Sequence, residues 1–310
     1  MNYTFCEISY PSTDGVHTVH AGLYLPTSGD VRGVVQLAHG MIDHIGRYTR
    51  LADALAQSGF ILAGNDHLGH GKSVNSRDEL GFFSDKDSVG LLLSDMYKLN
   101  SMLHERYPTL PVIILGHSMG SFLARLYVQR HSESVRGAVF LGTGGKNPLL
   151  PMGRALTSLV ILTKGARHRS RLIEKLAFGS YNARFPRSEG ADAWLTRDTE
   201  ILSEIAKDEL RDFKFTSAGY RALFSMLAAV NSDKWFSEYP KRLPTLIMSG
   251  GDDPVGDYSR GVGSVYKRLM TAGASDASLK IYAGARHELF NETNREEFFA
   301  DLSAWLEKIK

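Results

Sequence analysis

Ser118 lies at the centre of the pentapeptide Gly116-His117-Ser118-Met119-Gly120, which has the pattern G-x-S-x-G. The apolar run Val112–Leu115 before it is typical of a buried strand, and Met119–His131 after it has helical periodicity. A strand, a sharp turn and a helix in this order expose a serine hydroxyl at the edge of a sheet. Glycines flank the serine because the two backbones must approach closely there. The pattern predicts that Ser118 attacks an acyl group as a nucleophile.

A serine nucleophile needs a base and a group that orients the base. In this setting the chain order is serine, acid, histidine. Ten of the eleven histidines lie at or before His168, so we expect the remaining one, His287, to be the base. The acid is expected in the loop after the strand-like run Thr245–Ser249, where Asp253 is preferred and Asp252 is the alternative. Pro254 favours an extended Asp253, which directs its side chain out of the loop.

Two backbone N–H groups are expected to stabilise the charge that develops on the acyl oxygen. One belongs to Met119, the residue after the nucleophile. The other is expected in the loop His39–His44, which follows the strand-like run ending at Ala38. Met41 is the candidate, because Gly40 before it permits a close approach.

Short apolar runs alternate with helical patterns and predict the elements that position these residues. Strands are expected at Thr4–Ser9, Thr18–Tyr24, Gly33–Ala38, Ile61–Asp66, Val112–Leu115, Val135–Leu141, Thr245–Ser249 and Leu279–Tyr282. Helices are expected at Tyr48–Ser58, Val89–Tyr107, Met119–His131, Val262–Thr271 and Glu296–Ile309. Four of the expected strands contain nearly continuous apolar runs, as in parallel sheets buried on both faces. The alternation predicts an α/β sheet covered by helices on both faces.

The alternation stops between about Asn147 and Tyr239, where helical periodicity continues without a convincing strand. We interpret residues 147–239 as a helical cap over the carboxyl edge of the sheet. Residues 1–146 and 240–310 then form the catalytic domain. Apolar cap residues are expected in part to line a pocket above Ser118: Leu149, Leu150, Leu156, Leu159, Val160, Ile161, Leu162, Phe178, Phe224 and Leu227.

Composition narrows the class of protein. The 310 residues are 43% hydrophobic and 23% charged with a net charge of +2, so no overall charge favours nucleic acid. A single cysteine, Cys6, excludes an intrachain disulfide and a cysteine-based metal site. Met1–Asp14 has no secretory signal pattern, and no apolar run approaches the ~20 residues of a membrane span. We expect a soluble cytoplasmic protein.

Three patterns that suggest other ligands are incomplete. Asp66-His67-Leu68-Gly69-His70 lacks the spacing of zinc motifs and is expected to stabilise a turn, so no metal is predicted. Gly71-Lys72-Ser73 would end a phosphate-binding loop only if position 66 were glycine. Gly142-Thr143-Gly144-Gly145 lacks the last glycine of a dinucleotide fingerprint. No cofactor is expected.

The motifs together resemble the monoacylglycerol lipase and lysophospholipase branch of the α/β-hydrolases, a branch of the serine aminopeptidase S33 type. The resemblance is carried by His39-Gly40-Met41-Ile42-Asp43-His44-Ile45-Gly46-Arg47-Tyr48, Asp66–Ser73, Gly116–Gly120, Asp253-Pro254-Val255 and His287. It implies an eight-stranded, mostly parallel sheet with a cap inserted before the acid-bearing strand. It also implies hydrolysis of esters of single-acyl-chain lipids or related small esters. Asp43 departs from the glutamate usual in this branch, at a position that is not catalytic.

Two other functions remain open. One is a peptidase of the same fold, although the loop from His39 lacks the longer glycine- and proline-rich sequence typical of those enzymes. The other is a non-catalytic ligand-binding relative, which usually has lost a member of the triad. A basic cluster in the cap is interpreted as a solvated helix face, with peripheral contact to anionic lipid as the alternative: Lys164, Arg167, His168, Arg169, Arg171 and Lys175.

Overall fold

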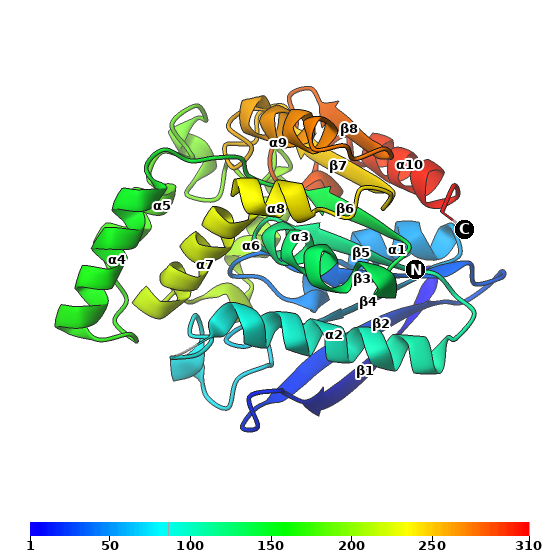
Figure 1. Cartoon of the computed structure of the whole chain (residues 1–310), viewed down its shortest axis with the longest axis horizontal. Coiled ribbons are helices and arrows are strands. Elements are labelled where there is room, and N and C mark those ends of the chain that lie inside the picture. Colours follow the sequence, from blue (N-terminus) through cyan, green and yellow to red (C-terminus); the bar gives the residue numbers. More distant parts are fainter. Residues whose placement is uncertain (86, 310) are drawn as a thin grey trace.

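The computed structural model describes residues 1–85 and 87–309, in which eight strands form one sheet in the order β1-β2-β4-β3-β5-β6-β7-β8 (Figure 1). Their bounds are β1 Tyr3–Pro11, β2 Thr18–Pro26, β3 Gly33–Ala38, β4 Phe60–Asn65, β5 Val112–His117, β6 Gly137–Leu141, β7 Thr245–Gly250 and β8 Ala277–Tyr282. Strand β2 pairs antiparallel with β1 and β4, and the pairs from β4 through β3 to β8 are parallel. All eight predicted strands are therefore present.

Helices cover both faces of the sheet and lie between the strands in the chain. Their bounds are α1 Thr49–Gln57, α2 Ser88–Arg106, α3 Met119–His131, α4 Leu150–Lys164, α5 Arg171–Phe178, α6 Thr199–Ala206, α7 Ser217–Val230, α8 Asp233–Glu238, α9 Arg260–Thr271 and α10 Arg295–Leu306. Helices α2, α3 and α9 contribute to one core, and α1 and α10 to the other. Figure 1 shows α2 and α3 on the near face.

Successive residues of the central strands enter opposite cores because side chains alternate across a strand. In β5, Ile114 belongs to the core beneath α2 and α3, while Ile113 and Leu115 belong to the core beneath α1 and α10. All six residues of β5 are buried. Burial on both faces explains the nearly continuous apolar runs in the sequence. The prediction of a mostly parallel sheet with helices on both faces is confirmed.

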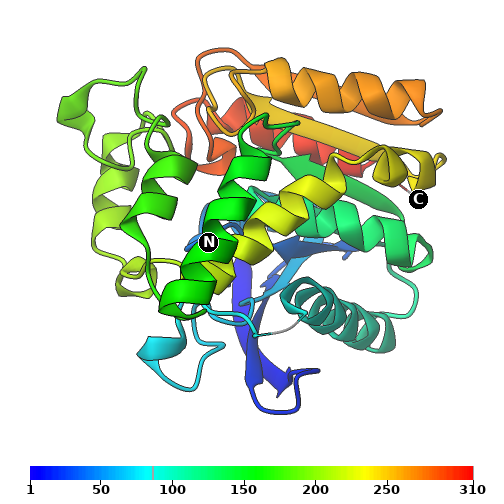
Figure 2. The same cartoon turned by 60° about the vertical axis from the view of Figure 1, so that its left-hand side comes forward.

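Helices α4 to α8 lie between β6 and β7, and no strand occurs among the described residues between these two strands. Helix α7 packs against α3 and α4, so the helical insertion, residues 147–239, is in contact with the helix that follows Ser118. Figure 2 brings this insertion to the front. Its separation from the remainder of the chain as a domain stays a prediction.

Element boundaries differ from the predictions at a few ends. Strand β6 begins at Gly137 rather than Val135, and a 3-10 turn at Ser132–Ser134 precedes it. Helix α10 ends at Leu306 rather than Ile309.

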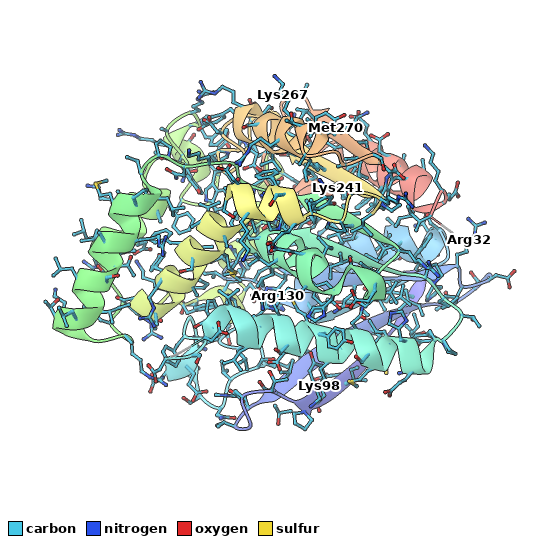
Figure 3. All side chains as sticks on the ribbon, viewed as in Figure 1. Arg32, Lys98, Arg130, Lys241, Lys267 and Met270 are labelled. Carbon is cyan, nitrogen blue, oxygen red and sulfur yellow. The ribbon has the colours of Figure 1, made fainter. Side chains whose placement is uncertain are left out.

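Figure 3 shows the side chains on the ribbon and labels five cations. The labelled cations Arg32, Lys98, Arg130, Lys241 and Lys267 are spread over different elements. Across residues 1–85 and 87–309, none of the helices combines the length and the apolar character that crossing a bilayer requires.

Candidate active site

Ser118 occupies the turn between β5 and α3 in a strained conformation, with φ +55° and ψ −121°. A side chain at Gly116 would collide with the backbone of Gly120, and one at Gly120 would collide with Ala38. The turn is fixed further by the Ser118 N–H, which donates to the carbonyl of Leu141 at 2.9 Å. A non-glycine residue with positive φ costs free energy and is found where the structure around it enforces it. The sequence-predicted serine turn is present.

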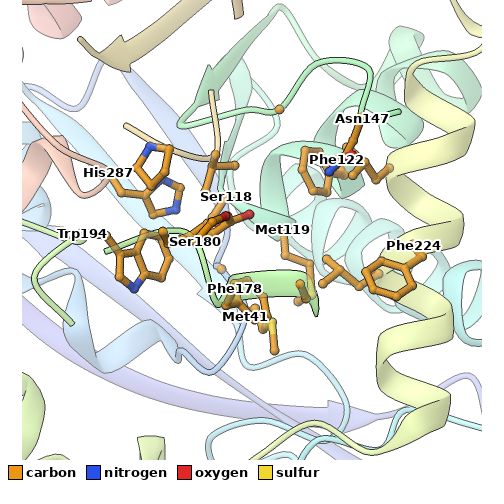
Figure 4. A pocket seen from close by; sticks show the side chains of 18 of the residues that line it. Met41, Ser118, Met119, Phe122, Asn147, Phe178, Ser180, Trp194, Phe224 and His287 are labelled. Atoms are coloured by element: carbon orange, nitrogen blue, oxygen red, sulfur yellow. The ribbon is translucent and has the colours of Figure 1, made fainter. Parts of the chain in front are cut away.

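His287 and Asp253 form the hydrogen-bonded pair that the sequence predicts. The imidazole Nδ1 lies 2.9 Å from Asp253 Oδ2, and both side chains are almost completely buried. Nδ1 is therefore the donor to the carboxylate. Nε2 of His287 has no partner among the described residues, and His287 lies beside Ser118 in Figure 4. Asp252 is exposed, so the geometry favours Asp253 over the alternative.

Neighbouring groups hold the imidazole of His287 in place. Gly142 has φ +59°, and a Cβ on it would lie 3.0 Å from Cε1 of His287, so the end of β6 passes directly over the ring. The rings of Trp194 and His117 each lie 4.9 Å from the His287 ring, measured between centroids. Trp194 comes from the helical insertion. These contacts leave little freedom for the imidazole to rotate.

The loop Gly40–His44 approaches the nucleophile closely. A Cβ on Gly40 would lie 3.3 Å from Cβ of Ser118. The N–H groups of Met41 and Met119 donate to no described residue, and both residues line the same pocket as Ser118. Both N–H groups therefore lack an acceptor among the described residues, and their role as oxyanion donors stays a prediction.

A buried ionic network beside the site was missed by reasoning from individual residues. Arg47 donates to Asp43 at 2.9 Å and to both carboxylate oxygens of Glu288, the closer at 2.9 Å. Tyr48 donates to Asp43 at 2.7 Å and contacts Nδ1 of His117 at 3.0 Å. The network thus ties the Gly40–His44 loop to the residue that follows His287. The sequence signal was the segment Asp43–Tyr48, which entered only through the family resemblance.

Electrostatics in the network keep its carboxylates ionised. Burial alone would raise the pKa of Asp43, but Arg47 and nearby imidazoles hold it well below its usual range. Burial also opposes ionisation of Glu288, whose pKa is nevertheless lowered by Arg47. Burial and the neighbouring His287 lower the pKa of His117 to about 4, so His117 is neutral at neutral pH.

A pocket of about 620 Å³ opens above Ser118, between the sheet edge and the helical insertion. Figure 4 shows Phe122, Phe178 and Phe224 around it. Of the apolar cap residues expected there, those that line it are Leu149, Leu150, Phe178, Phe224 and Leu227. Val160 is instead buried in the core, and Leu159 and Leu162 are exposed.

The basic cluster of the insertion does not form one helix face. Helix α4 ends at Lys164 and α5 begins at Arg171, so Arg167, His168 and Arg169 lie in the connecting segment. Arg167 stacks on Phe82 at 4.0 Å. Arg169 donates to backbone carbonyls, among them that of Leu80 at 2.9 Å. The interpretation as a single helix face was wrong, because these two cations fasten the insertion to the loop after β4.

Asp66 has the contacts of a turn-stabilising residue. Its Oδ1 accepts from the N–H of Ile45 at 2.8 Å, and its Oδ2 accepts from the N–H of Lys72 at 2.8 Å. Lys72 itself pairs with Glu7 at 2.9 Å on the surface. Within residues 1–85 and 87–309, no group of three or more histidine, cysteine, aspartate or glutamate side chains is arranged to hold a metal ion.

The sheet order, the serine turn after β5 and the histidine after β8 define an α/β-hydrolase. The chain belongs to the Hydrolase_4 family, described as serine aminopeptidase, S33, whose model matches residues 29–294. It is 28% identical to the monoacylglycerol lipase of Mycolicibacterium smegmatis, over 98% of this chain and 97% of that protein. It is 27% identical to human monoglyceride lipase, over 96% of this chain and 92% of that protein.

Solved structures resemble the whole chain. A highly thermostable carboxyl esterase from Bacillus coagulans, in complex with glycerol, superposes with a TM-score of 0.91 at 28% identity and covers 99% of each chain. A soluble variant of the monoglyceride lipase of Saccharomyces cerevisiae, in complex with a substrate analogue, superposes with a TM-score of 0.79 at 20% identity. At 20% identity, the resemblance to the Saccharomyces cerevisiae structure shows a shared fold alone.

Proposed function

We propose that this protein is a serine hydrolase that cleaves carboxylic esters of single-acyl-chain lipids or related small esters. The observation that carries the proposal is that Ser118, Met41, Met119 and His287, which is hydrogen-bonded to Asp253, are gathered at one pocket with both polar and apolar lining residues. The similarity to monoacylglycerol lipases and to a carboxyl esterase supports it. The helical insertion acts as the cap that selects the substrate.

The geometry supports an acyl-enzyme mechanism. Ser118 Oγ attacks the ester carbonyl while Nε2 of His287 accepts the hydroxyl proton. Asp253 holds Nδ1 as the donor and stabilises the imidazolium that forms. The N–H groups of Met41 and Met119 receive the oxyanion. His287 then protonates the departing alcohol. A water molecule, deprotonated by the same nitrogen, attacks the acyl carbon; the bond to Ser118 Oγ breaks, the carboxylic acid leaves, and His287 returns the proton to Oγ.

An aminopeptidase is the second candidate, because the family description names that activity. Such an enzyme must hold the substrate's ammonium group with an available carboxylate. Several pocket carboxylates are already paired: Glu174 with Lys214 at 2.8 Å, Glu288 with Arg47 at 2.9 Å and Asp257 with Arg260 at 2.9 Å. Asp192 also lines the pocket and has no ion pair among the described residues, so it would be the candidate ammonium ligand of a peptidase.

Comparing turnover of p-nitrophenyl esters with that of aminoacyl p-nitroanilides tests the choice. We expect ester turnover to exceed anilide turnover by orders of magnitude. A preference for the anilides would establish the peptidase, and failure to turn over either class would favour a non-catalytic relative.

We also propose that the exposed side of the insertion contacts lipid surfaces. Apolar side chains there are exposed by 52% to 83%, next to Lys164, Arg171 and Lys175: Leu149, Met152, Leu159, Leu162 and Leu172. Exposed apolar groups beside cations suit the boundary of an anionic lipid layer. Sedimentation with phosphatidylcholine vesicles, with and without phosphatidylglycerol, tests this proposal. Leu162→Ser should weaken binding, and equal binding of both proteins would contradict it.

A further inference from the structure

The turn between α6 and α7 contacts the loop that carries Met41. Arg211, the last residue of the 3-10 turn Glu209–Arg211, donates from Nε to the carbonyl of Ile42 at 2.9 Å. Asp208, at the start of the same turn, lies 2.9 Å from Nε2 of His44 through its Oδ2. Its Oδ1 accepts from the N–H of Leu210 at 3.0 Å, which orients the carboxylate. Two residues of the helical insertion therefore contact one loop of the sheet edge.

Ile42 has a conformation that requires support. Its φ is +51°, in the left-handed region that β-branched residues rarely adopt. Such a residue persists only where the surrounding structure enforces it. Neighbouring residues have their own supports: the carbonyl of Gly40 contacts Nδ1 of His39 at 2.8 Å, and Asp43 is held by Arg47. Among the described residues, Arg211 is the one hydrogen-bond partner of the Met41–Ile42 backbone.

We propose that Arg211, supported by Asp208, is a positioning residue for the oxyanion site: it holds Ile42 so that the N–H of Met41 faces Ser118. The inference rests on the proposed function, in which Met41 receives the oxyanion. It follows that the helical insertion does more than enclose substrate. Its α6–α7 turn completes the catalytic geometry, and displacing that turn releases one of the two donors.

The matched control is a second arginine contact between the insertion and the remainder of the chain. Arg50 on α1 donates to both carboxylate oxygens of Glu204 on α6 at 3.0 Å, and both side chains are partly exposed. This ion pair attaches the insertion without contacting the Gly40–His44 loop. Arg50→Met and Arg211→Met each remove one guanidinium and keep an apolar stem. Comparing the two variants distinguishes a general weakening of the contact between the insertion and the remainder of the chain from a displacement of the Gly40–His44 loop.

Steady-state hydrolysis of a soluble p-nitrophenyl ester is the first measurement. Arg211→Met should lower kcat by roughly 10²-fold, the scale of a misplaced catalytic group, with KM nearly unchanged. Arg211→Lys keeps a donor for the Ile42 carbonyl and should lose less. Arg50→Met should keep the kcat of the unmodified protein. Affinity for a trifluoromethyl ketone, whose adduct with Ser118 carries an oxyanion, should fall in Arg211→Met in proportion to kcat/KM.

Equal losses in Arg50→Met and Arg211→Met, or a loss confined to KM, would overturn the proposal. Amide hydrogen exchange of residues 40–44 tests it without relying on activity. Exchange there should be faster in Arg211→Met than in the unmodified protein, and unchanged in Arg50→Met. If the unmodified protein hydrolyses no ester, the proposed function fails, whereas unchanged exchange in Arg211→Met would refute the positioning role itself.

Discussion

Four completely buried histidines surround the active-site edge of the sheet, and they predict a steep loss of stability in mild acid. Burial, reinforced by the neighbouring imidazole of His70, lowers the pKa of His67 to about 3. Burial also lowers the pKa of His70 to about 4, and burial together with His287 lowers that of His117 to about 4. The pKa of His39 is well below its usual value, again mainly through burial. At neutral pH all four are neutral.

The direction of the pH dependence of stability follows from the number of protons that the folded and unfolded states bind. An unfolded chain binds a proton at each histidine near pH 6.5, whereas the native protein resists protonation down to about pH 4. Stability is therefore complete above about pH 6.5 and falls as the pH drops towards the native values. pH 5 lies about 1.5 units below the pKa of a histidine in the unfolded chain. Each buried histidine therefore lowers the free energy of unfolding at pH 5 by about 2 kcal/mol. His67, His70 and His117, whose native pKa values are about 3 to 4, together amount to about 6 kcal/mol, comparable to the whole stability of many proteins, and His39 acts in the same direction.

The number of protons taken up on thermal unfolding tests this predicted difference between the two states directly. It is obtained by calorimetry in buffers of different ionisation enthalpy. We expect about four protons taken up at pH 5, one for each buried histidine. His70→Phe should take up one fewer, because its ring already lies among Phe83, Phe213 and Phe215. Proton uptake near zero at pH 5 would refute the reasoning.

His17 provides the control. Partial burial lowers its pKa, but hydrogen bonds with Asp14 and Glu79 outweigh this and raise it. Both states hold the His17 proton at pH 5, so His17→Phe should leave the uptake at that pH unchanged. If His17→Phe changed the proton uptake at pH 5 as much as His70→Phe, the uptake could not be assigned to the buried histidines.

Three further predictions concern the chemistry. Asp253→Asn should lower kcat by as much as about 10⁴-fold, because the amide no longer fixes the His287 tautomer, whereas exposed Asp252→Asn should change it little; the reverse ranking would transfer the role to Asp252. His287→Ala should be nearly as damaging to ester turnover as Ser118→Ala, because triad members act as a unit, and a mild loss would argue against base catalysis by His287. In a series of even-numbered p-nitrophenyl esters below micellar concentrations, kcat/KM should rise about tenfold for each two carbons from acetate until the pocket is full, since each buried methylene contributes about 0.8 kcal/mol; a maximum at acetate would contradict a single-chain pocket.

The sheet and the serine turn were predictable because local pattern and long-range packing agree. The runs in β3, β5, β6 and β7 are nearly continuous in apolar residues, with Gln36 in β3 as an exception, because both faces of these strands are buried, as in a parallel sheet between helices. The chain order of Ser118, Asp253 and His287 limited the choice of partners. The catalytic roles of these residues stay predictions, as does the cytoplasmic location.

Contacts between distant segments could not be read from the sequence. Arg47 and Glu288 are separated by 241 positions and Arg211 and Ile42 by 169, and no periodicity brings such pairs together. The positive φ of Ile42 was equally hidden, because isoleucine is a poor candidate for that conformation. The basic segment after Lys164 was misread because stacking of Arg167 on Phe82 depends on tertiary packing.

Labelling with a fluorophosphonate tests the central claim most directly, because the probe reacts covalently with an activated serine. We predict one adduct per chain, located at Ser118 by peptide mass analysis, with loss of ester hydrolysis in proportion to labelling. Ser118→Ala should remain folded, take up no probe and hydrolyse no ester. An adduct at another residue, or near-native turnover by Ser118→Ala, would contradict the account.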